Sequence, residues 1–134
     1  NFEEAYINFS KAIQLKPNYP EALNERGFVY WSTNQWPKAM EDYNKAIEAK
    51  PTYAQAYENR GNLNWGSYHP KEALQDYTKA IDLGMTSVYS TRGCCYHLMG
   101  EREKAYEDYN KCLQLNLTTA EELTNRAVLY HSLE

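Results

Sequence analysis

The 134-residue sequence lacks several features that identify common classes of protein. It contains three cysteines and no Cys-x-x-Cys pair, which argues against a disulfide framework and against a zinc cluster. No apolar run approaches about 18 residues, so no membrane span is expected. The net charge of −4 provides no basic surface for nucleic acid. Because the first ten residues also lack the regions of a signal peptide, we expect a reducing, cytoplasmic location.

Aliphatic residues are scarce as well. Leu, Ile, Val and Phe together account for only 22 of the 134 residues, a fraction that by itself would suggest disorder. The chain compensates with 13 Tyr, 3 Trp and 13 Ala. Aromatic side chains bury large areas, and alanine lets helices approach closely, so this composition favours packed helices.

Two short patterns recur along the chain. The first is Arg-Gly, at Arg26-Gly27, Arg60-Gly61 and Arg92-Gly93, with Arg126-Ala127 in the fourth position; the steps between copies are 34, 32 and 34 residues. The second places Ala, an aromatic residue and a small residue at i, i+4 and i+7, which is one face of a helix. Its copies are Ala5-Phe9-Ala12, Ala39-Tyr43-Ala46, Ala73-Tyr77-Ala80 and Ala105-Tyr109-Cys112.

The two patterns alternate, so the repeated unit is a pair of helices separated by short turns. Pro17 and Pro51 end two of the helices, and Gly84 is suited to the position just after a third. No alternating pattern typical of strands appears. The sequence therefore predicts helices over 2–15, 20–33, 37–50, 54–67, 71–83, 86–99, 103–115 and 120–133.

A helical hairpin of 34 residues with Leu, Gly and Tyr in its first helix and Ala, Tyr, Ala and Pro in its second resembles the tetratricopeptide repeat. Repeat one carries this set in full, as Leu23, Gly27, Tyr30, Ala39, Tyr43, Ala46 and Pro51. The resemblance implies an all-α fold, a right-handed α-solenoid of antiparallel hairpins with about eight helices. It also implies one domain over 1–134, made of a partial repeat 1–19, repeats 20–53, 54–85 and 86–119, and a partial repeat 120–134.

Three details of packing follow. Each glycine should leave space for the bulky aromatic residue of a second helix, since Gly inside a helix costs about 1 kcal/mol in propensity and needs compensation. Each arginine should either pair with an acid on the preceding second helix or extend to solvent. The expected pairs are Asp42–Arg60, Asp76–Arg92 and Asp108–Arg126, with Arg26 facing Asn8. Repeat 54–85 is two residues short, which predicts a shorter second helix or loop.

In the family that the chain resembles, the first helices line a concave groove that holds a ligand. Carried over position by position, the resemblance implies that the groove contains Asn24, Phe28, Trp31, Glu58, Asn59, Asn62, Trp65, Ser90, Thr91, Cys94, His97, Asn125 and His131. Two tryptophans and two histidines of this set share one helical position, so they predict a ladder of anchors for a partner. The alternative is that Trp31 and Trp65 pack between neighbouring first helices.

Charge limits the kind of partner. Some relatives clamp a C-terminal carboxylate with Lys and Arg at groove positions where this sequence has Glu21, Glu25 and Glu58. No carboxylate-clamp chaperone tail is therefore expected, and a neutral or basic segment suits the groove better. An asparagine ladder for peptide backbone is only partial, at Asn59 and Asn125.

The residues do not indicate a metal site or a catalytic site. His97 and His131 should lie about 8–10 Å apart on neighbouring hairpins, too far to share a metal ion. Cys94 and His97 lack an orienting acid, so Cys94 is interpreted as a small buried residue. We therefore expect no catalytic, cofactor or metal site, and a non-enzymatic scaffold that binds a protein or peptide. The alternatives are an assembly element that associates head to tail with itself, and the targeting arm of a larger enzyme or complex.

Overall fold

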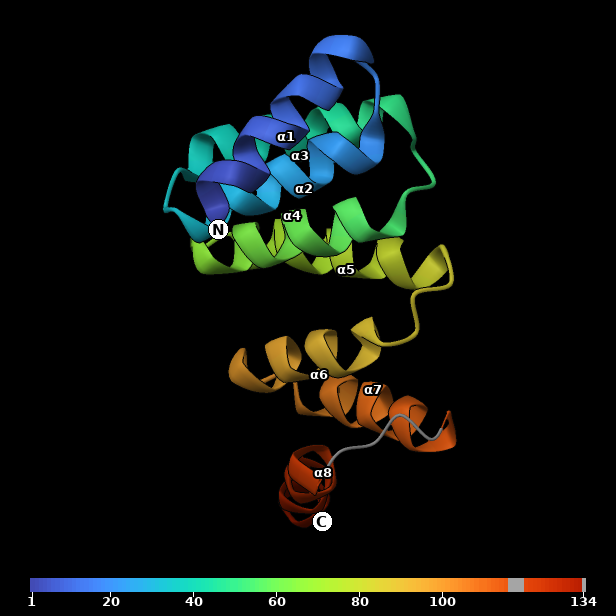
Figure 1. Ribbon diagram of the computed structural model, residues 1–134. Helices are drawn as coiled ribbons and strands as arrows, with labels where there is room; N and C mark the ends of the chain where they lie inside the picture. Colours follow the sequence, from blue (N-terminus) through green and yellow to red (C-terminus); the bar gives the residue numbers. More distant parts are fainter. Residues whose placement is uncertain (116–119, 134) are drawn as a thin grey trace. The chain divides into compact units, whose positions relative to one another are not determined.

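The structure is a computed structural model that describes residues 1–115 and 120–133, with side chains of the last helix given for 120 and 123–129. The described residues form eight helices and no strand, an all-α fold (Figure 1). Every predicted helix is present, with ends that differ from the expected ones by at most two residues. The helices are α1 (Phe2–Leu15), α2 (Pro20–Ser32), α3 (Trp36–Ala49), α4 (Ala54–Gly66), α5 (Pro70–Asp82), α6 (Val88–Leu98), α7 (Arg102–Gln114) and α8 (Ala120–Leu133).

Contacts within the chain divide it into two compact units. The first unit spans Asn1–Leu83 and contains α1 to α5, and the second spans Gly84–Glu134 and contains α6 to α8. Helices α2 and α3, α4 and α5, and α6 and α7 pair most extensively, each as an antiparallel hairpin (Figure 1). Helix α1 packs on α2 and α3 packs on α4 in the first unit, while α7 packs on α8 in the second.

Prolines and left-handed turn residues set the helix ends. A proline lies in the first turn of α2, α3 and α5, where its missing N–H leaves no helix hydrogen bond unmade. Each turn inside a hairpin contains one residue with positive φ: Asn34 at 60°, Tyr68 at 64° and Gly100 at 79°. The next amide closes each turn with a bond of 2.8–2.9 Å to a carbonyl five residues back, as in a Schellman motif. Gly84, with φ of 96°, follows α5 as predicted.

Of the three turns, the one at Tyr68 has an unfavourable residue. Asn and Gly tolerate the left-handed region, whereas a bulky side chain there is strained, and Tyr68 is 92% exposed and gains little by packing. We expect Tyr68→Gly to raise the free energy of unfolding by about 0.5–1 kcal/mol. Urea unfolding followed by circular dichroism measures this change. Asn34→Gly is the matched control and should gain less; an equal or smaller gain for Tyr68→Gly would contradict the strain at Tyr68.

The glycines accommodate tyrosines, as the sequence predicted. A Cβ atom added to Gly27 would lie 2.7 Å from Tyr43 Cε1, and one added to Gly61 would lie 2.7 Å from Tyr77 Cε1. The tyrosine rings belong to the second helix of the same hairpin, and they are 1% exposed. Alanines around them are fully buried and complete a core of small and aromatic residues in each unit. The core is therefore filled by tyrosine rings and alanines, which explains why few aliphatic residues are needed.

The recurrent arginines are paired with acids, but in a different register from the predicted one. Arg26, Arg60 and Arg92 each bind the aspartate 16 residues later, on the second helix of their own hairpin. The pairs are Arg26–Asp42, Arg60–Asp76 and Arg92–Asp108, each with two hydrogen bonds of 2.7–3.0 Å. The predicted pairs with the preceding helix, and the alternative of arginines extending to solvent, are both wrong. The preceding helix instead offers neutral oxygens: Ser10 Oγ to Arg26, Asn44 Oδ1 to Arg60 and Asn110 Oδ1 to Arg126.

These ion pairs are largely buried, since the three aspartates are between 2% and 5% exposed. The hydrogen bond to Asp76 raises the pKa of Arg60 above its ordinary value, although burial acts in the opposite direction. Asp76 also accepts a bond of 3.1 Å from the buried Asn64 Nδ2. A charged pair removed from water needs this degree of hydrogen bonding. Each Arg–Asp pair therefore fixes the two helices of its hairpin in one register.

The two-residue shortening is located mainly at the start of a first helix. Helices α2 and α4 begin seven residues before Gly27 and Gly61, whereas α6 begins at Val88, five residues before Gly93. The connection between α5 and α6 is one residue longer than that between α3 and α4, and α5 is one residue shorter than α3. The expectation of a shorter loop is therefore wrong, and that of a shorter second helix accounts for one residue.

Candidate functional site

In the first unit, the expected site residues lie on α2 and α4. On α2, Asn24, Phe28 and Trp31 recur at i, i+4 and i+7, so they share one side of the helix. Phe28 and Trp31 are 42% and 39% exposed, and their ring centroids are 5.6 Å apart in a tilted arrangement. They form a small exposed aromatic pair, the kind of surface that provides contact area for a partner.

Asn24 behaves differently from the aromatic pair. It is fully buried, and its Oδ1 accepts a hydrogen bond of 2.9 Å from Asn59 Nδ2 on α4. Its own Nδ2 donates to Glu25 Oε1 at 3.3 Å. Asn59 Oδ1 in turn accepts from Gln55 Nε2 at 3.3 Å. The asparagines therefore join the two first helices to one another, which leaves Asn24 little capacity to hold a partner's backbone.

The remaining α4 residues continue the same side of the unit. Asn62 is exposed, and its Oδ1 accepts a bond of 2.8 Å from the Tyr77 hydroxyl of α5. Glu58 accepts a bond of 2.8 Å from Gln55 Nε2, and Trp65 is half-buried. We call the set Phe28, Trp31, Glu58, Asn59, Asn62 and Trp65 the α2/α4 face. Sequence reasoning missed the orientation of Asn62 by Tyr77, because no local pattern links residues on two helices.

The other expected site residues belong to the second unit. Ser90, Thr91 and His97 on α6 are half-buried, as is Asn125 on α8. Cys94 is exposed, so its interpretation as a small buried residue is wrong; Cys95 and Cys112 are the buried cysteines. The side chain of His131 lies outside the described residues.

The α2/α4 face carries negative charge and no cation. Glu58 belongs to it, and Glu21 and Glu25 of α2 occupy the neighbouring positions where a carboxylate clamp would need Lys or Arg. Lys50 Nζ, at the end of α3, lies 4.0 Å from Glu21 Oε1. Arg26 and Arg60 lie on the other side of their helices, held by Asp42 and Asp76. A surface with more acids than cations repels an acidic ligand and attracts a basic one.

A metal-binding cluster and a membrane-spanning helix are both absent from the described part of the chain. No three His, Cys, Asp or Glu side chains among residues 1–115 and 120–133 gather as a possible metal site. Across the same ranges, every helix is too short or too polar to cross a bilayer.

Comparison with protein families gives a consistent result along the chain. A tetratricopeptide TPR repeat model matches residues 1–34 and 32–67, and a second tetratricopeptide repeat model matches residues 87–118. No curated protein matches the chain significantly.

Solved structures similar to this chain carry the same fold. MamA is 26% identical, with a TM-score of 0.85 over 98% of this chain and 78% of its own. PilF from Pseudomonas aeruginosa is 23% identical, with a TM-score of 0.89 over 98% of this chain and 61% of its own. The first TPR domain of Spaghetti (RPAP3), solved with the HSP90 peptide SRMEEVD, is 24% identical, with a TM-score of 0.76 over 85% of this chain and 92% of its own.

Proposed function

Since the chain belongs to the tetratricopeptide repeat family, we propose that it is a non-enzymatic interaction module that holds a neutral or basic peptide or helix on its α2/α4 face. The repeats and their structural neighbours support a protein-interaction scaffold. We extend the proposal to the second unit, in which Ser90, Thr91, Cys94, His97, Asn125 and His131 also take part in partner binding.

The observation that carries the proposal is the exposed aromatic pair Phe28 and Trp31, on a helix that is hydrogen-bonded to its neighbour. Phe28 and Trp31 expose about two fifths of their surface beside an inter-helix hydrogen bond from Asn59 to Asn24. That bond joins α2 to α4, the two helices that present the aromatic rings, and the Tyr77–Asn62 bond joins α4 to α5. Aromatic anchors on a preorganised surface contribute most of the binding free energy in many interfaces. The partial exposure also fits the alternative of tryptophan packing, because each indole shares its surface between the core and solvent.

The charge of the face supports a particular class of partner. The Spaghetti domain was solved with a peptide whose sequence, SRMEEVD, contains three acidic residues. In this chain the clamp positions carry Glu21, Glu25 and Glu58, so the same peptide would meet like charges. A neutral or basic segment avoids that repulsion, and its association should weaken as salt is raised.

Phage display of a random peptide library against the whole chain tests the proposal. We expect neutral and basic peptides to be enriched over acidic ones. The double variant Trp31→Ala/Trp65→Ala should bind the enriched peptides at least about tenfold more weakly, because aromatic anchors each contribute of the order of 2 kcal/mol. Isothermal titration calorimetry measures the loss, after circular dichroism has shown that the variant is folded.

Trp36→Ala is the matched control, since Trp36 is 41% exposed but belongs to α3 and is not part of the α2/α4 face. It should leave peptide affinity unchanged. Equal affinity of the double variant and the wild type, or enrichment of acidic peptides, would refute the proposed face.

A further inference from the structure

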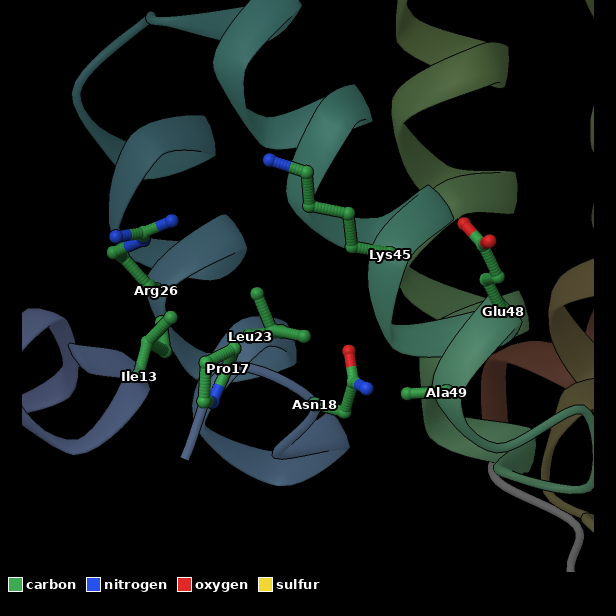
Figure 2. Close-up of a pocket in the computed structure, with 8 residues that line it drawn as sticks. All are labelled: Ile13, Pro17, Asn18, Leu23, Arg26, Lys45, Glu48 and Ala49. Carbon is green, nitrogen blue, oxygen red and sulfur yellow. The ribbon is translucent and has the colours of Figure 1, made fainter. Parts of the chain in front are cut away.

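Two pockets of the first unit differ in whether the chain already binds their charged groups. The larger, of about 620 Å³, lies among α1, α2 and α3 and includes Arg26 and Lys45 (Figure 2). Within the chain, Arg26 is paired with Asp42 and Lys45 with Glu41. Because both cations have internal partners, this pocket offers little charge to an incoming group.

The smaller pocket, of about 380 Å³, lies where the start of α3 meets the end of α4 and the start of α5. Trp36 and Met40 of α3 line it, as does Glu72 of α5. Trp36 is 41% exposed and Glu72 is also exposed, whereas Met40 is half-buried. None of the residues that line this pocket belongs to the α2/α4 face. Binding here is therefore independent of the function proposed for that face.

In the repeats on either side of this one, the chain places its own cation over its own aromatic ring at the equivalent positions. The ring is the tyrosine four residues after the recurrent arginine, and the cation is the lysine at the third residue of the second helix. The ammonium nitrogen lies 5.4 Å from the ring centre in the pair Lys38–Tyr30 and 5.6 Å in the pair Lys104–Tyr96. Repeats one and three therefore form a cation–π contact from within the chain.

Repeat two has neither member of this pair. Asn64 stands in place of the tyrosine and Glu72 in place of the lysine. Asn64 Nδ2 is bonded to Asp76, and asparagine is smaller than tyrosine, so the end of α4 leaves more space in the pocket. Glu72 forms no ion pair within the described residues, and Lys71, the next cation along α5, lies about 100° away around the helix. The pocket thus contains an exposed indole of Trp36 and a carboxylate, but no lysine or arginine.

We propose that this pocket binds an arginine side chain of a partner protein. The guanidinium stacks on the Trp36 indole and donates hydrogen bonds to the Glu72 carboxylate, while the aliphatic stem lies against Met40. Arginine suits these groups because its planar head both stacks on aromatic rings and forms paired bonds with a carboxylate. The partner thereby supplies the cation that Lys38 and Lys104 supply in the neighbouring repeats.

One side chain held in this way binds weakly. An exposed ion pair and one cation–π contact together give a dissociation constant of the order of 1–10 mM. The pocket therefore strengthens a larger interface and does not by itself retain a short peptide in a library selection. For that reason, Trp36→Ala remains the control for peptides that bind the α2/α4 face.

The probe for the experiment is N-acetylarginine methylamide, whose only charge is the guanidinium. It is titrated into the whole chain at constant ionic strength, and the indole N–H signals of the three tryptophans are followed by ¹H–¹⁵N NMR. We expect a saturable shift of the Trp36 signal and of the Glu72 amide. The citrulline analogue, which has the same shape without the charge, should bind at least about threefold more weakly because it cannot form the ion pair.

Glu72→Lys is the decisive variant, since it gives repeat two the lysine of its neighbours and should lower the affinity of the arginine probe at Trp36 at least about fivefold. Glu72→Gln keeps the shape of the side chain and should lower that affinity about threefold. Glu107→Lys is the matched control, because it makes the same charge change at an exposed residue of α7, and it should keep the affinity within twofold.

Two results would overturn the proposal. One is equal affinity of the wild type, Glu72→Gln and Glu72→Lys for the arginine probe, or equal affinity of the wild type for the arginine and citrulline probes. The other is a set of shifts confined to Trp31 and Trp65, which would place the guanidinium on the α2/α4 face. That second result would support the function proposed for the α2/α4 face, so the two proposals can fail separately.

Discussion

Replacing Asp76 with alanine is expected to lower the free energy of unfolding by about 3–5 kcal/mol. Asp76 is 5% exposed and accepts three hydrogen bonds: two from Arg60, of 2.7 and 3.0 Å, and one of 3.1 Å from Asn64. Without the carboxylate, a half-buried guanidinium loses two of its hydrogen bonds and a buried amide loses one, while both groups remain shielded from water. The cost arises from these unsatisfied donors more than from the lost attraction.

Urea unfolding of Asp76→Ala, followed by circular dichroism, measures the effect. The matched control is Glu41→Ala, which removes the acid of an ion pair of similar length: Lys45 Nζ lies 2.6 Å from Glu41 Oε1. That pair is exposed on both sides and should contribute little that can be measured. If both variants unfolded at the same urea concentration, burial would not be the source of the stability of the Arg60–Asp76 pair.

The second large effect is expected at Gly61, where Gly61→Leu should lower the free energy of unfolding by about 2–3 kcal/mol. A Cβ atom at this position would lie 2.7 Å from Tyr77 Cε1, 2.9 Å from Tyr77 Cδ1 and 3.3 Å from Asp76 Cβ. Tyr77 is 1% exposed, so its ring is enclosed by neighbouring groups. Helices α4 and α5 must therefore separate, which strains the Arg60–Asp76 pair as well. Leucine is a better helix former than glycine, but that gain of about 1 kcal/mol is smaller than the cost.

Gly66→Leu provides the comparison for this prediction. Gly66 is the last residue of the same helix, and a Cβ atom there meets nothing within 4 Å. The substitution should leave the urea midpoint unchanged or raise it slightly. A midpoint for Gly61→Leu equal to that of Gly66→Leu would show that the hairpin has room for a side chain at Gly61.

The helix boundaries and the core could be predicted because local chemistry determines them. Pro17 and Pro51 each follow the end of a helix, because proline cannot continue the helical hydrogen bonding. The Ala–aromatic–small spacing defines a single helix face. The contact of each glycine with a tyrosine was also predictable, since Gly27 needs a bulky neighbour to offset its low helix propensity. These features depend on residues within one repeat.

The register of the ion pairs could not be predicted from sequence. Asp42 follows Arg26 by 16 residues and precedes Arg60 by 18, so distance along the chain barely separates the two arginines. A first helix lies between two second helices, and the periodic pattern does not say which of them its arginine faces. Only the crossing of the helices decides this, and it places Arg26 beside Asp42.

Parts of the candidate site were unpredictable for a similar reason. Burial depends on how neighbouring helices meet, so Asn24 was expected to face a ligand and instead bonds to Asn59. Cys94 was expected to be buried and is exposed, because its neighbour Cys95 points to the core of the hairpin. Identical residue types at successive positions give the sequence no means to distinguish the two.

The pairing of each arginine with an aspartate of its own hairpin has an evolutionary consequence. A gene segment that encodes one such hairpin can be duplicated or deleted without separating a buried carboxylate from its cation. The reason is that the same segment encodes both partners, as with Arg60 and Asp76. Had the pairs linked successive hairpins, every duplication or loss would have required a compatible charge at the new junction. Across that junction, Arg60 bonds instead to a neutral oxygen, that of Asn44. An ancestor of this chain could therefore lengthen or shorten by whole cassettes at little energetic cost.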